Sequence, residues 1–464
     1  MKSSSFNIWV HDQPAGKALL YNSLYGSLTT FDPDEHRLAA SLLNRPEKIP
    51  DEAQQPFHEL LIRQRYLIAD TTDERAIIEN RKREGIRDNN RLDVIIMPTL
   101  DCNFACTYCY ESRRQSMMSP GTETAIKKWL QAEVGHHKVL LLHWFGGEPL
   151  LGYQRVISIT RHAVEVTRAA GSACISHMTT NGYLLNKHSI SGLIDAGIYD
   201  YQITVDGPAD VHDRYRVLRN GGGTFNQVFR NIALLACANE RVRISLRVNF
   251  NHQNMKCIPS LLEAFPIGIR KQLRVVFEPI FGDNALSATG NLDAAEISAG
   301  LSEYYGLAST LGYDVVLGLS AVHLGKLVYC YAERQNQYIF NYNGDVFKCS
   351  VCDFQHGDRV GYLRDDGTIV REAAWNDWVS EDLFEPGCYS CPTLPLCMGG
   401  CRRMRLEGAG TGSTCALVPT NTSYILKQIA FGNLKEALAG VAARPCAGPN
   451  ARHCSDLQSL PERG

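Results

Sequence analysis

Six apolar segments alternate with amphipathic helical segments between residues 91 and 285, and this alternation constrains the fold more than any other feature. The predicted strands are residues 93–100, 138–145, 173–179, 199–205, 242–250 and 272–279. Strands that alternate with helices of this length form parallel β/α units. We therefore predict an α/β fold centred on a partial (β/α)6 barrel of the TIM type. In such barrels the chemistry lies on loops that follow the carboxyl ends of the strands.

Three cysteines, Cys102, Cys106 and Cys109, follow the first predicted strand on one short loop. Thiolates hold iron–sulfur clusters, and a four-iron cluster normally takes four of them. A set of three on one loop therefore leaves one iron for a ligand that is not protein. A zinc loop is the alternative, but tetrahedral zinc sites usually pair two short Cys or His motifs. These three residues are the candidate catalytic and metal-binding centre.

The spacing of this loop, with Tyr108 before its last cysteine, resembles the cluster loop of the radical S-adenosylmethionine (SAM) enzymes. Gly146, Gly147 and Glu148 follow the second predicted strand and resemble the segment with which that family holds the amino group of SAM. The resemblance implies a [4Fe-4S] cluster, bound SAM and a 5′-deoxyadenosyl radical that removes hydrogen from an unreactive carbon. The cofactor then carries the reaction, and the protein positions the reacting groups.

Polar residues at three further strand ends are candidate SAM contacts. Thr179 and Asn181 close the third strand, Asp206 follows the fourth, and Arg247 lies on the fifth. The family commonly uses these places, and an arginine can pair with the carboxylate of methionine. Turn capping or a strand-end salt bridge is the structural alternative for each residue. The charged stretch at residues 212–216 is predicted to form a solvated loop, with contact to the substrate as the alternative.

A second cysteine pattern, which includes Gly344, begins at residue 330 and resembles the seven-cysteine SPASM domain. That domain carries two auxiliary four-iron clusters. By position, Cys330, Cys349 and Cys401 would hold the nearer cluster, and Cys388, Cys391, Cys397 and Cys415 the farther one. The nearer cluster then either takes Cys352 as a fourth ligand or keeps an open iron for a substrate thiolate. Zinc is again the alternative, because pairs of cysteines two residues apart also suit zinc.

The cysteine usage and the charge indicate a cellular setting. The chain has 16 cysteines, and its first residues lack the apolar core of a signal peptide. In a reducing compartment, clustered cysteines more readily indicate metal sites than disulfides. The net charge of −2 gives no general affinity for nucleic acid or an anionic membrane. We therefore expect a cytoplasmic protein with no nucleic-acid partner and no membrane.

Residues 1–90 are predicted to form a separate winged-helix-like module. Asp32 is the expected cap of its first helix, with Glu35 as the capping-box acid. The further domains predicted from the sequence are the barrel at 91–285, a connecting helical segment at 286–329, the SPASM domain at 330–420, and a C-terminal helix and tail at 421–464 with Cys446 and Cys454.

The two resemblances together imply an enzyme that modifies peptides. SPASM enzymes mostly act on peptides or proteins, and maturases of ribosomally made peptides often carry a winged-helix leader-binding module. We therefore expect a precursor peptide with a leader as substrate, a flavodoxin- or ferredoxin-type reductant as partner, and a thioether or carbon–carbon crosslink, or a related modification, as product. A maturase of the anaerobic sulfatase type is the alternative, although Ser350 stands where that group has an aspartate base. A non-catalytic iron–sulfur or zinc protein is a remote alternative.

Anaerobic reconstitution with iron and sulfide is expected to load roughly twelve irons per chain, because three four-iron clusters are implied. Colorimetric iron and sulfide analysis of the desalted protein measures this count. A value of about four irons would leave room for the first cluster alone and would remove the auxiliary clusters.

Overall fold

The computed structural model describes residues 1–12, 16–280, 294–315, 327–408, 422 and 426. These residues belong to two compact units. The smaller unit combines residues 1–87, 327–334 and 379–408, and the larger one combines residues 88–315 and 335–378. No helix among the described residues is both long and apolar enough to cross a lipid bilayer. Cys415, Cys446 and Cys454, and the predicted tail beyond residue 426, lie outside the described residues.

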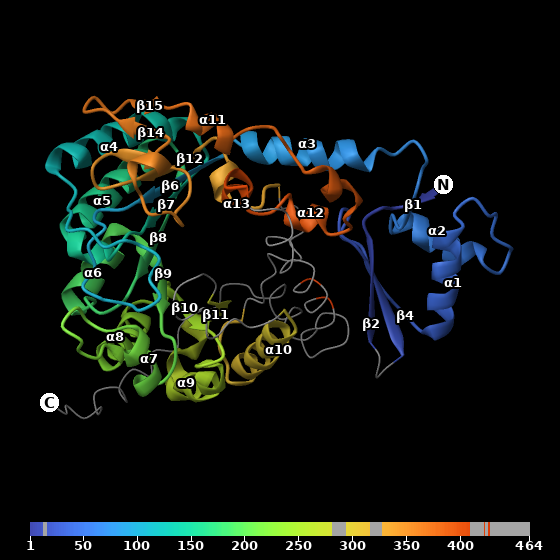
Figure 1. Cartoon of the computed structure of the whole chain (residues 1–464), viewed down its shortest axis with the longest axis horizontal. Coiled ribbons are helices and arrows are strands. Elements are labelled where there is room, and N and C mark those ends of the chain that lie inside the picture. The colour runs from blue at the N-terminus through green and yellow to red at the C-terminus, as the bar shows by residue number, and fades with distance from the viewer. Residues whose placement is uncertain (13–15, 281–293, 316–326, 409–421, 423–425, 427–464) are drawn as a thin grey trace. The chain divides into compact units, whose positions relative to one another are not determined.

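Six parallel strands form one side of a ten-stranded sheet in the larger unit (Figure 1). They are β6 (Arg91–Ile96), β7 (Val139–Trp144), β8 (Ala173–Thr180), β9 (Ile198–Thr204), β10 (Arg243–Phe250) and β11 (Leu273–Pro279). Each strand pairs in parallel with the next one in the sequence. The predicted α/β fold is thereby confirmed. The sheet stays open in the described residues, because β11 and β15 are its two edges.

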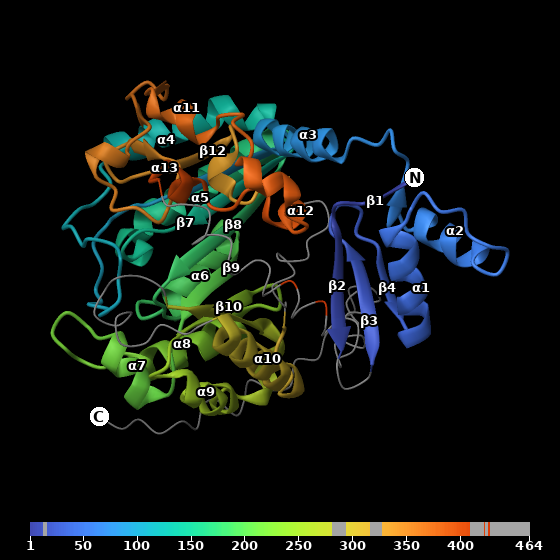
Figure 2. The ribbon, with the colours of Figure 1, turned by 45° about the vertical axis from the view of Figure 1, so that its right-hand side comes forward.

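Helices connect these strands, as the apolar periodicity predicts (Figure 2). They are α4 (Pro120–Glu133), α5 (Tyr153–Ala169), α6 (Lys187–Ala196), α7 (Ala209–Tyr215), α8 (Phe225–Ala238) and α9 (Ile258–Ala264), with α10 (Ala294–Thr310) after β11. Local residues set their starts, since Ser119 caps α4 and Asn186 caps α6 through side-chain oxygens. The helices cover buried strand faces. Trp144 of β7, for example, is fully buried and donates to Thr160 Oγ1 of α5 over 3.0 Å.

Residues from the cysteine-rich part of the chain extend the same sheet. The strand β12 (Gln337–Phe340) pairs in parallel with β6, and β13 (Asp345–Phe347), β14 (Gly361–Leu363) and β15 (Ile369–Arg371) continue it in antiparallel fashion, followed by α11 (Ala374–Trp378). The turn between β12 and β13 places Gly344 at φ +87°, a conformation that favours glycine. Four strands in this region were not predicted, because their segments are short and their partners are distant in the sequence.

The N-terminal residues form a three-stranded antiparallel sheet covered by two helices. The strands are β2 (Asn7–Asp12), β3 (Lys17–Asn22) and β4 (Leu28–Phe31), the helices are α1 (Pro33–Asn44) and α2 (Gln55–Arg63), and a further pair joins β1 (Lys2–Ser3) to β5 (Leu67–Ile68). The predicted capping box of α1 is confirmed, since Asp32 and Glu35 make both of its hydrogen bonds. Leu20, Leu43 and Tyr66 belong to the core between sheet and helices.

The smaller unit also contains α3 (Glu74–Arg87), α12 (Leu394–Cys397) and α13 (Arg402–Leu406). Phe6 and Leu24 from the N-terminal residues share one apolar core with Ile78 of α3 and with Leu394 and Met398. Residues far apart in the sequence thus build a single core. The sequence shows α3 only as a charged stretch, because most of its residues are polar and its buried face is narrow.

Gly85 of α3 packs directly against the backbone of Leu327. A Cβ atom added there would lie 2.8 Å from the backbone carbon of Leu327 and 2.5 Å from its Cβ. Glycine is therefore required at this position despite its cost in a helix.

Gly85→Ala is expected to lower the free energy of unfolding by about 1–3 kcal/mol, because the backbone of Leu327 has to move. Gly306→Ala is the matched control, since a Cβ atom at Gly306 on α10 meets nothing within 4 Å. That change should stabilise the protein by up to about 1 kcal/mol through helix propensity. Urea unfolding of both variants tests the pair, and equal stabilisation by both would contradict the packing of α3 on Leu327.

Candidate active site

The cysteine loop follows β6 and lies against the chain that leaves α7. Backbone hydrogen bonds join Ala105 N–H to Val217 C=O over 2.7 Å and Thr107 N–H to Tyr215 C=O over 2.9 Å. Cys102 and Cys106 are partly exposed, and Cys109 is exposed. The loop is therefore held by backbone pairing, and none of its three cysteines is fully buried.

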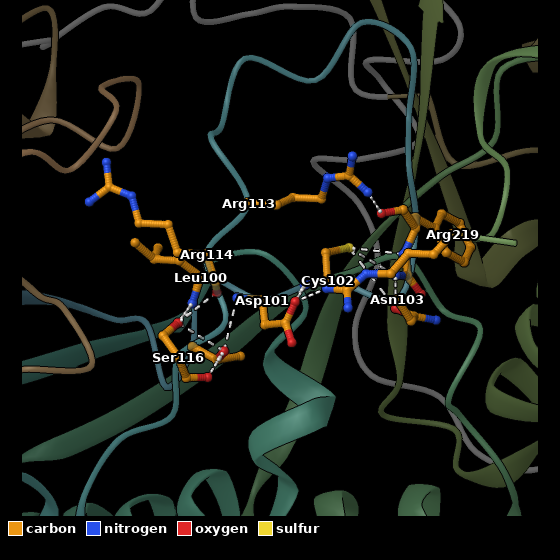
Figure 3. Close-up of polar contacts among 11 residues, drawn as sticks. Leu100, Asp101, Cys102, Asn103, Arg113, Arg114, Ser116 and Arg219 are labelled. Carbon is orange, nitrogen blue, oxygen red and sulfur yellow. Dashed lines mark hydrogen bonds and ion pairs between the residues drawn. The ribbon is translucent and has the colours of Figure 1, made fainter.

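A cleft of about 340 Å³ opens beside Cys102. Figure 3 shows the polar contacts of Asp101, Cys102 and Asn103 at this place. Its lining residues are Asp101, Cys102, Asn103, Leu151, Leu218, Arg219 and Asn220. Arg219 forms an ion pair with Asp101, which anchors the residue before the first cysteine. Arg113 donates to the carbonyl of Phe104 over 3.2 Å and braces the loop from its other end.

Gly146 and Gly147 follow β7 and let the backbone at the end of this strand pack directly against the backbone at the start of the cysteine loop. A Cβ atom at Gly146 would lie 2.4 Å from the carbonyl oxygen of Thr99, and one at Gly147 would lie 2.3 Å from that of Asp101. Because the glycines have no Cβ atoms, the backbones are close enough for hydrogen bonds: Gly147 N–H donates to Thr99 C=O over 3.2 Å, and Glu148 N–H donates to Asp101 C=O over 2.8 Å. The glycines thus bring the end of β7 onto the start of the cysteine loop.

Glu148 is fully buried, with 0% of its surface exposed. Its Oε1 accepts from Leu150 N–H over 2.9 Å and from Thr180 Oγ1 over 2.8 Å, and its Oε2 accepts from Asn181 N–H over 2.8 Å. Burial raises the pKa of Glu148, and the three donors oppose that shift. The carboxylate therefore ties the end of β7 to the end of β8.

Asn181 continues this connection to the cysteines. Its Nδ2 donates to Asn103 Oδ1 over 2.8 Å and lies 3.8 Å from the sulfur of Cys102. Thr179 precedes it by two residues on β8 and is partly exposed. The third predicted strand end is therefore brought to the cysteine loop, with Asn181 in direct contact.

The remaining two candidates lie in a buried polar network around Tyr108. The Tyr108 hydroxyl donates to Asp206 and accepts from Asn249 Nδ2 over 3.1 Å. Asp206 Oδ1 accepts from Asn249 N–H over 3.0 Å, and Arg247 Nε donates to Asn249 Oδ1 over 2.8 Å. Burial raises the pKa of Asp206. Asp206 and Arg247 are thus joined to the cysteine loop through Asn249 and Tyr108.

The prediction of a solvated loop at residues 212–216 is wrong. Most of these residues belong to α7, on which His212 and Tyr215 are buried, and Arg216 follows with only 8% exposed. Arg216 donates to the Tyr108 hydroxyl over 2.8 Å. The spacing of His212, Tyr215 and Arg216, three and four residues apart, matches one helix face and could have revealed their burial.

Arg216 brings a buried positive charge to the cysteine loop. Burial opposes that charge, but Tyr108, Cys106 and Asp206 outweigh burial and raise the pKa of Arg216. Its Nε is buried and has no hydrogen-bond partner among the described residues. An iron–sulfur cluster with thiolate ligands is anionic, so the positively charged guanidinium of Arg216 and three thiols on one loop fit such a group.

The described residues contain no group of three His, Cys, Asp or Glu side chains placed to hold a single metal ion. A four-iron cluster does not require that convergence, because each thiolate binds a different iron. Burial raises the pKa of the Cys102 thiol to about 12, with Glu148 as the second cause. The thiol is therefore neutral until a metal displaces its proton.

The other predicted ligands are divided between the units. Cys349 and Cys352 lie in the larger unit, where the buried Cys352 thiol donates to Cys349 C=O over 3.2 Å. The smaller unit contains the other described members of the pattern, which are Cys330, Cys388, Cys391, Cys397 and Cys401.

Comparison with known proteins gives concordant matches. Residues 96–265 match the family model described as the Radical SAM superfamily. The PqqA peptide cyclase of Rhodopseudomonas palustris is 24% identical over 348 residues, which cover 71% of this chain and 87% of that protein. The cysteine-type anaerobic sulfatase-maturating enzyme of Clostridium novyi is 22% identical over 342 residues, which cover 67% and 88% of the two chains.

Two solved structures share the fold. One is native anSMEcpe with bound AdoMet and Cp18Cys peptide, with a TM-score of 0.56, 19% identity, and coverage of 75% of this chain and 99% of that chain. The other is Streptococcus suis SuiB bound to the precursor peptide SuiA, with a TM-score of 0.51, 14% identity, and coverage of 88% and 97%. At these identities the likeness concerns the fold alone.

Glu148→Gln is expected to lower the free energy of unfolding by about 1–3 kcal/mol, because the amide turns one acceptor oxygen into a donor that faces a donor. Glu165→Gln on the exposed side of α5 is the matched control and should have no measurable effect. Thermal unfolding of both variants measures the difference. A Glu148→Gln protein as stable as the control would contradict the clamp between β7 and β8.

Proposed function

We propose that the protein is a radical SAM maturase that modifies a ribosomally made precursor peptide, because residues 96–265 match the Radical SAM superfamily model. One observation supports this proposal most. Glu148 and Asn181 connect the cysteine loop to the ends of β7 and β8. The likeness to a peptide cyclase and to sulfatase-maturating enzymes supports a peptide or protein as the substrate class.

In this proposal Cys102, Cys106 and Cys109 hold the cluster whose open iron takes SAM. The bound group supplies the electron and the radical that removes hydrogen from the substrate. The residues of this chain bind and orient: Asn181 holds Asn103 beside the first cysteine, and Arg216 keeps a positive charge near Cys106. Gly146, Gly147, Glu148, Thr179, Asn181, Asp206 and Arg247 are proposed as the residues that bind SAM.

The cysteines of the second pattern are proposed to hold two auxiliary [4Fe-4S] clusters. Their ligands would be Cys330, Cys349 and Cys401 for one cluster and Cys388, Cys391, Cys397 and Cys415 for the other. Auxiliary clusters can take up an electron from a substrate radical, or bind a substrate sulfur. A flavodoxin- or ferredoxin-type protein is proposed as the external electron donor.

The N-terminal module is proposed to bind the leader of the precursor as an added strand on β4. Asn22 N–H donates to Ser27 C=O over 2.8 Å, so the alternation of an antiparallel ladder turns the N–H and C=O groups of Leu28 and Thr30 away from β3. Among the described residues, no strand pairs with that outer side of β4. Strand addition uses such an edge.

Thr30→Pro removes one outward N–H group of β4 without touching its ladder to β3, and should weaken binding of the precursor about fivefold. His11→Pro is the matched control, because the same alternation turns His11 outward on the opposite edge of the sheet. Titration with a precursor peptide identified by a search of the reading frames next to this gene gives both dissociation constants. Equal weakening, or weakening by His11→Pro alone, would contradict the assignment to β4.

Mass spectrometry of that precursor after anaerobic incubation with the enzyme, SAM and dithionite tests the function itself. A thioether or carbon–carbon crosslink lowers the peptide mass by two hydrogens per bond formed. The Cys109→Ala variant should leave the mass unchanged. An unmodified peptide, together with oxidation of a sulfatase-type Cys or Ser peptide, would favour the second candidate, an anaerobic sulfatase-type maturase. The likeness to the Clostridium novyi enzyme supports that candidate, whereas Ser350 in place of the expected aspartate argues against it.

A further inference from the structure

Lys82 of α3 is a buried amine that the proposed reaction does not use. Its side chain is 1% exposed, and its Nζ donates to Glu333 Oε1 over 2.5 Å and to Met398 C=O over 2.8 Å. Burial lowers the pKa of Lys82, and the carboxylate of Glu333 opposes that shift. A buried cation is costly unless it is paired and hydrogen-bonded, so both contacts are needed to keep Lys82 inside.

The first contact leads to Cys330. Glu333 follows Cys330 by three residues, and its Oε2 accepts from Cys330 N–H over 3.4 Å. The backbone N–H of Glu333 in turn donates to the sulfur of Cys330, which closes a capping box. Arg405 also donates to Glu333 Oε1, over 2.9 Å. The carboxylate that pairs with Lys82 thus fixes the backbone and the sulfur of a predicted cluster ligand.

The second contact leads to the turn between Cys397 and Cys401. Met398, Gly399 and Gly400 have φ values of +47°, +88° and +72°, so three consecutive residues lie in the left-handed region. That conformation is unfavourable for methionine and persists only where surrounding contacts determine it. Lys82 binds the carbonyl of Met398, and the Met398 side chain is buried in the apolar core of the unit.

We propose that Lys82 is a positioning residue for the auxiliary clusters. One ammonium group on α3 holds the segment that begins at Cys330 and the turn from Cys397 to Cys401 at a common point, so that their thiols are preorganised for iron. A lysine suits this role, because its compact charge offers three donors in different directions. The inference rests on the proposed function, in which these cysteines hold four-iron clusters.

Lys82→Met keeps the apolar stem and removes both contacts. In the reconstituted full chain, iron and sulfide should fall by at least one four-iron cluster, from about twelve irons to about eight or fewer. The electron paramagnetic resonance signal of the reduced SAM-binding cluster should remain. Hydrogen exchange of the amides between Cys397 and Cys401 should become faster. Glu84→Gln, at an exposed position of the same helix, is the control and should change none of these.

The double variant Lys82→Met/Glu333→Gln separates positioning from charge balance. It removes the carboxylate that the single change leaves behind, and should recover stability without recovering the lost irons. Full iron loading in either variant would overturn the inference, because a role in charge balance alone would then explain Lys82. About four irons in the wild-type chain would instead refute the auxiliary clusters themselves.

Discussion

The carboxylate of Glu148 is the interaction on which the candidate site depends. It is fully buried and accepts three hydrogen bonds from residues at the ends of β7 and β8. In the low-dielectric interior such a group is stabilising only while every partner stays in place. The two glycines before it hold the turn against the cysteine loop, and Asn181 connects the turn to Asn103. A single buried charge thus sets the position of the loop relative to two strands.

A second buried network fixes the loop from its other side. Tyr108 lies between two cysteines, and its hydroxyl contacts Asp206, Asn249 and Arg216. These partners come from the ends of β9 and β10 and from the segment after α7. Every side chain in the network has a hydrogen-bonded partner, while the Nε of Arg216 has none among the described residues. The loop is therefore hydrogen-bonded to three other segments through Tyr108, and Arg216 keeps a buried donor without a partner among the described residues.

Apolar periodicity and local capping residues predict the larger part of the fold. The six parallel strands follow from apolar runs, and the start of α1 follows from Asp32 and Glu35, because both signals lie within a few residues. The strand β12 was missed, since its pairing with β6 joins residues that are more than 200 positions apart. The helix α3 was missed because its burial depends on Leu327 and Met398. The sequence predicts a solvated Arg216 for a related reason, since its hydrogen-bond partner, Tyr108, belongs to the distant cysteine loop.

The account as a whole requires that Cys102, Cys106 and Cys109 support reductive cleavage of SAM. The direct measurement is 5′-deoxyadenosine formed from SAM and dithionite by the anaerobically reconstituted protein, compared with a Cys106→Ala variant treated identically. We expect product from the wild-type chain and none above background from the variant, in which one thiolate of the loop is missing. Cleavage that persists in Cys106→Ala, or is absent from the fully loaded wild-type chain, would contradict the account.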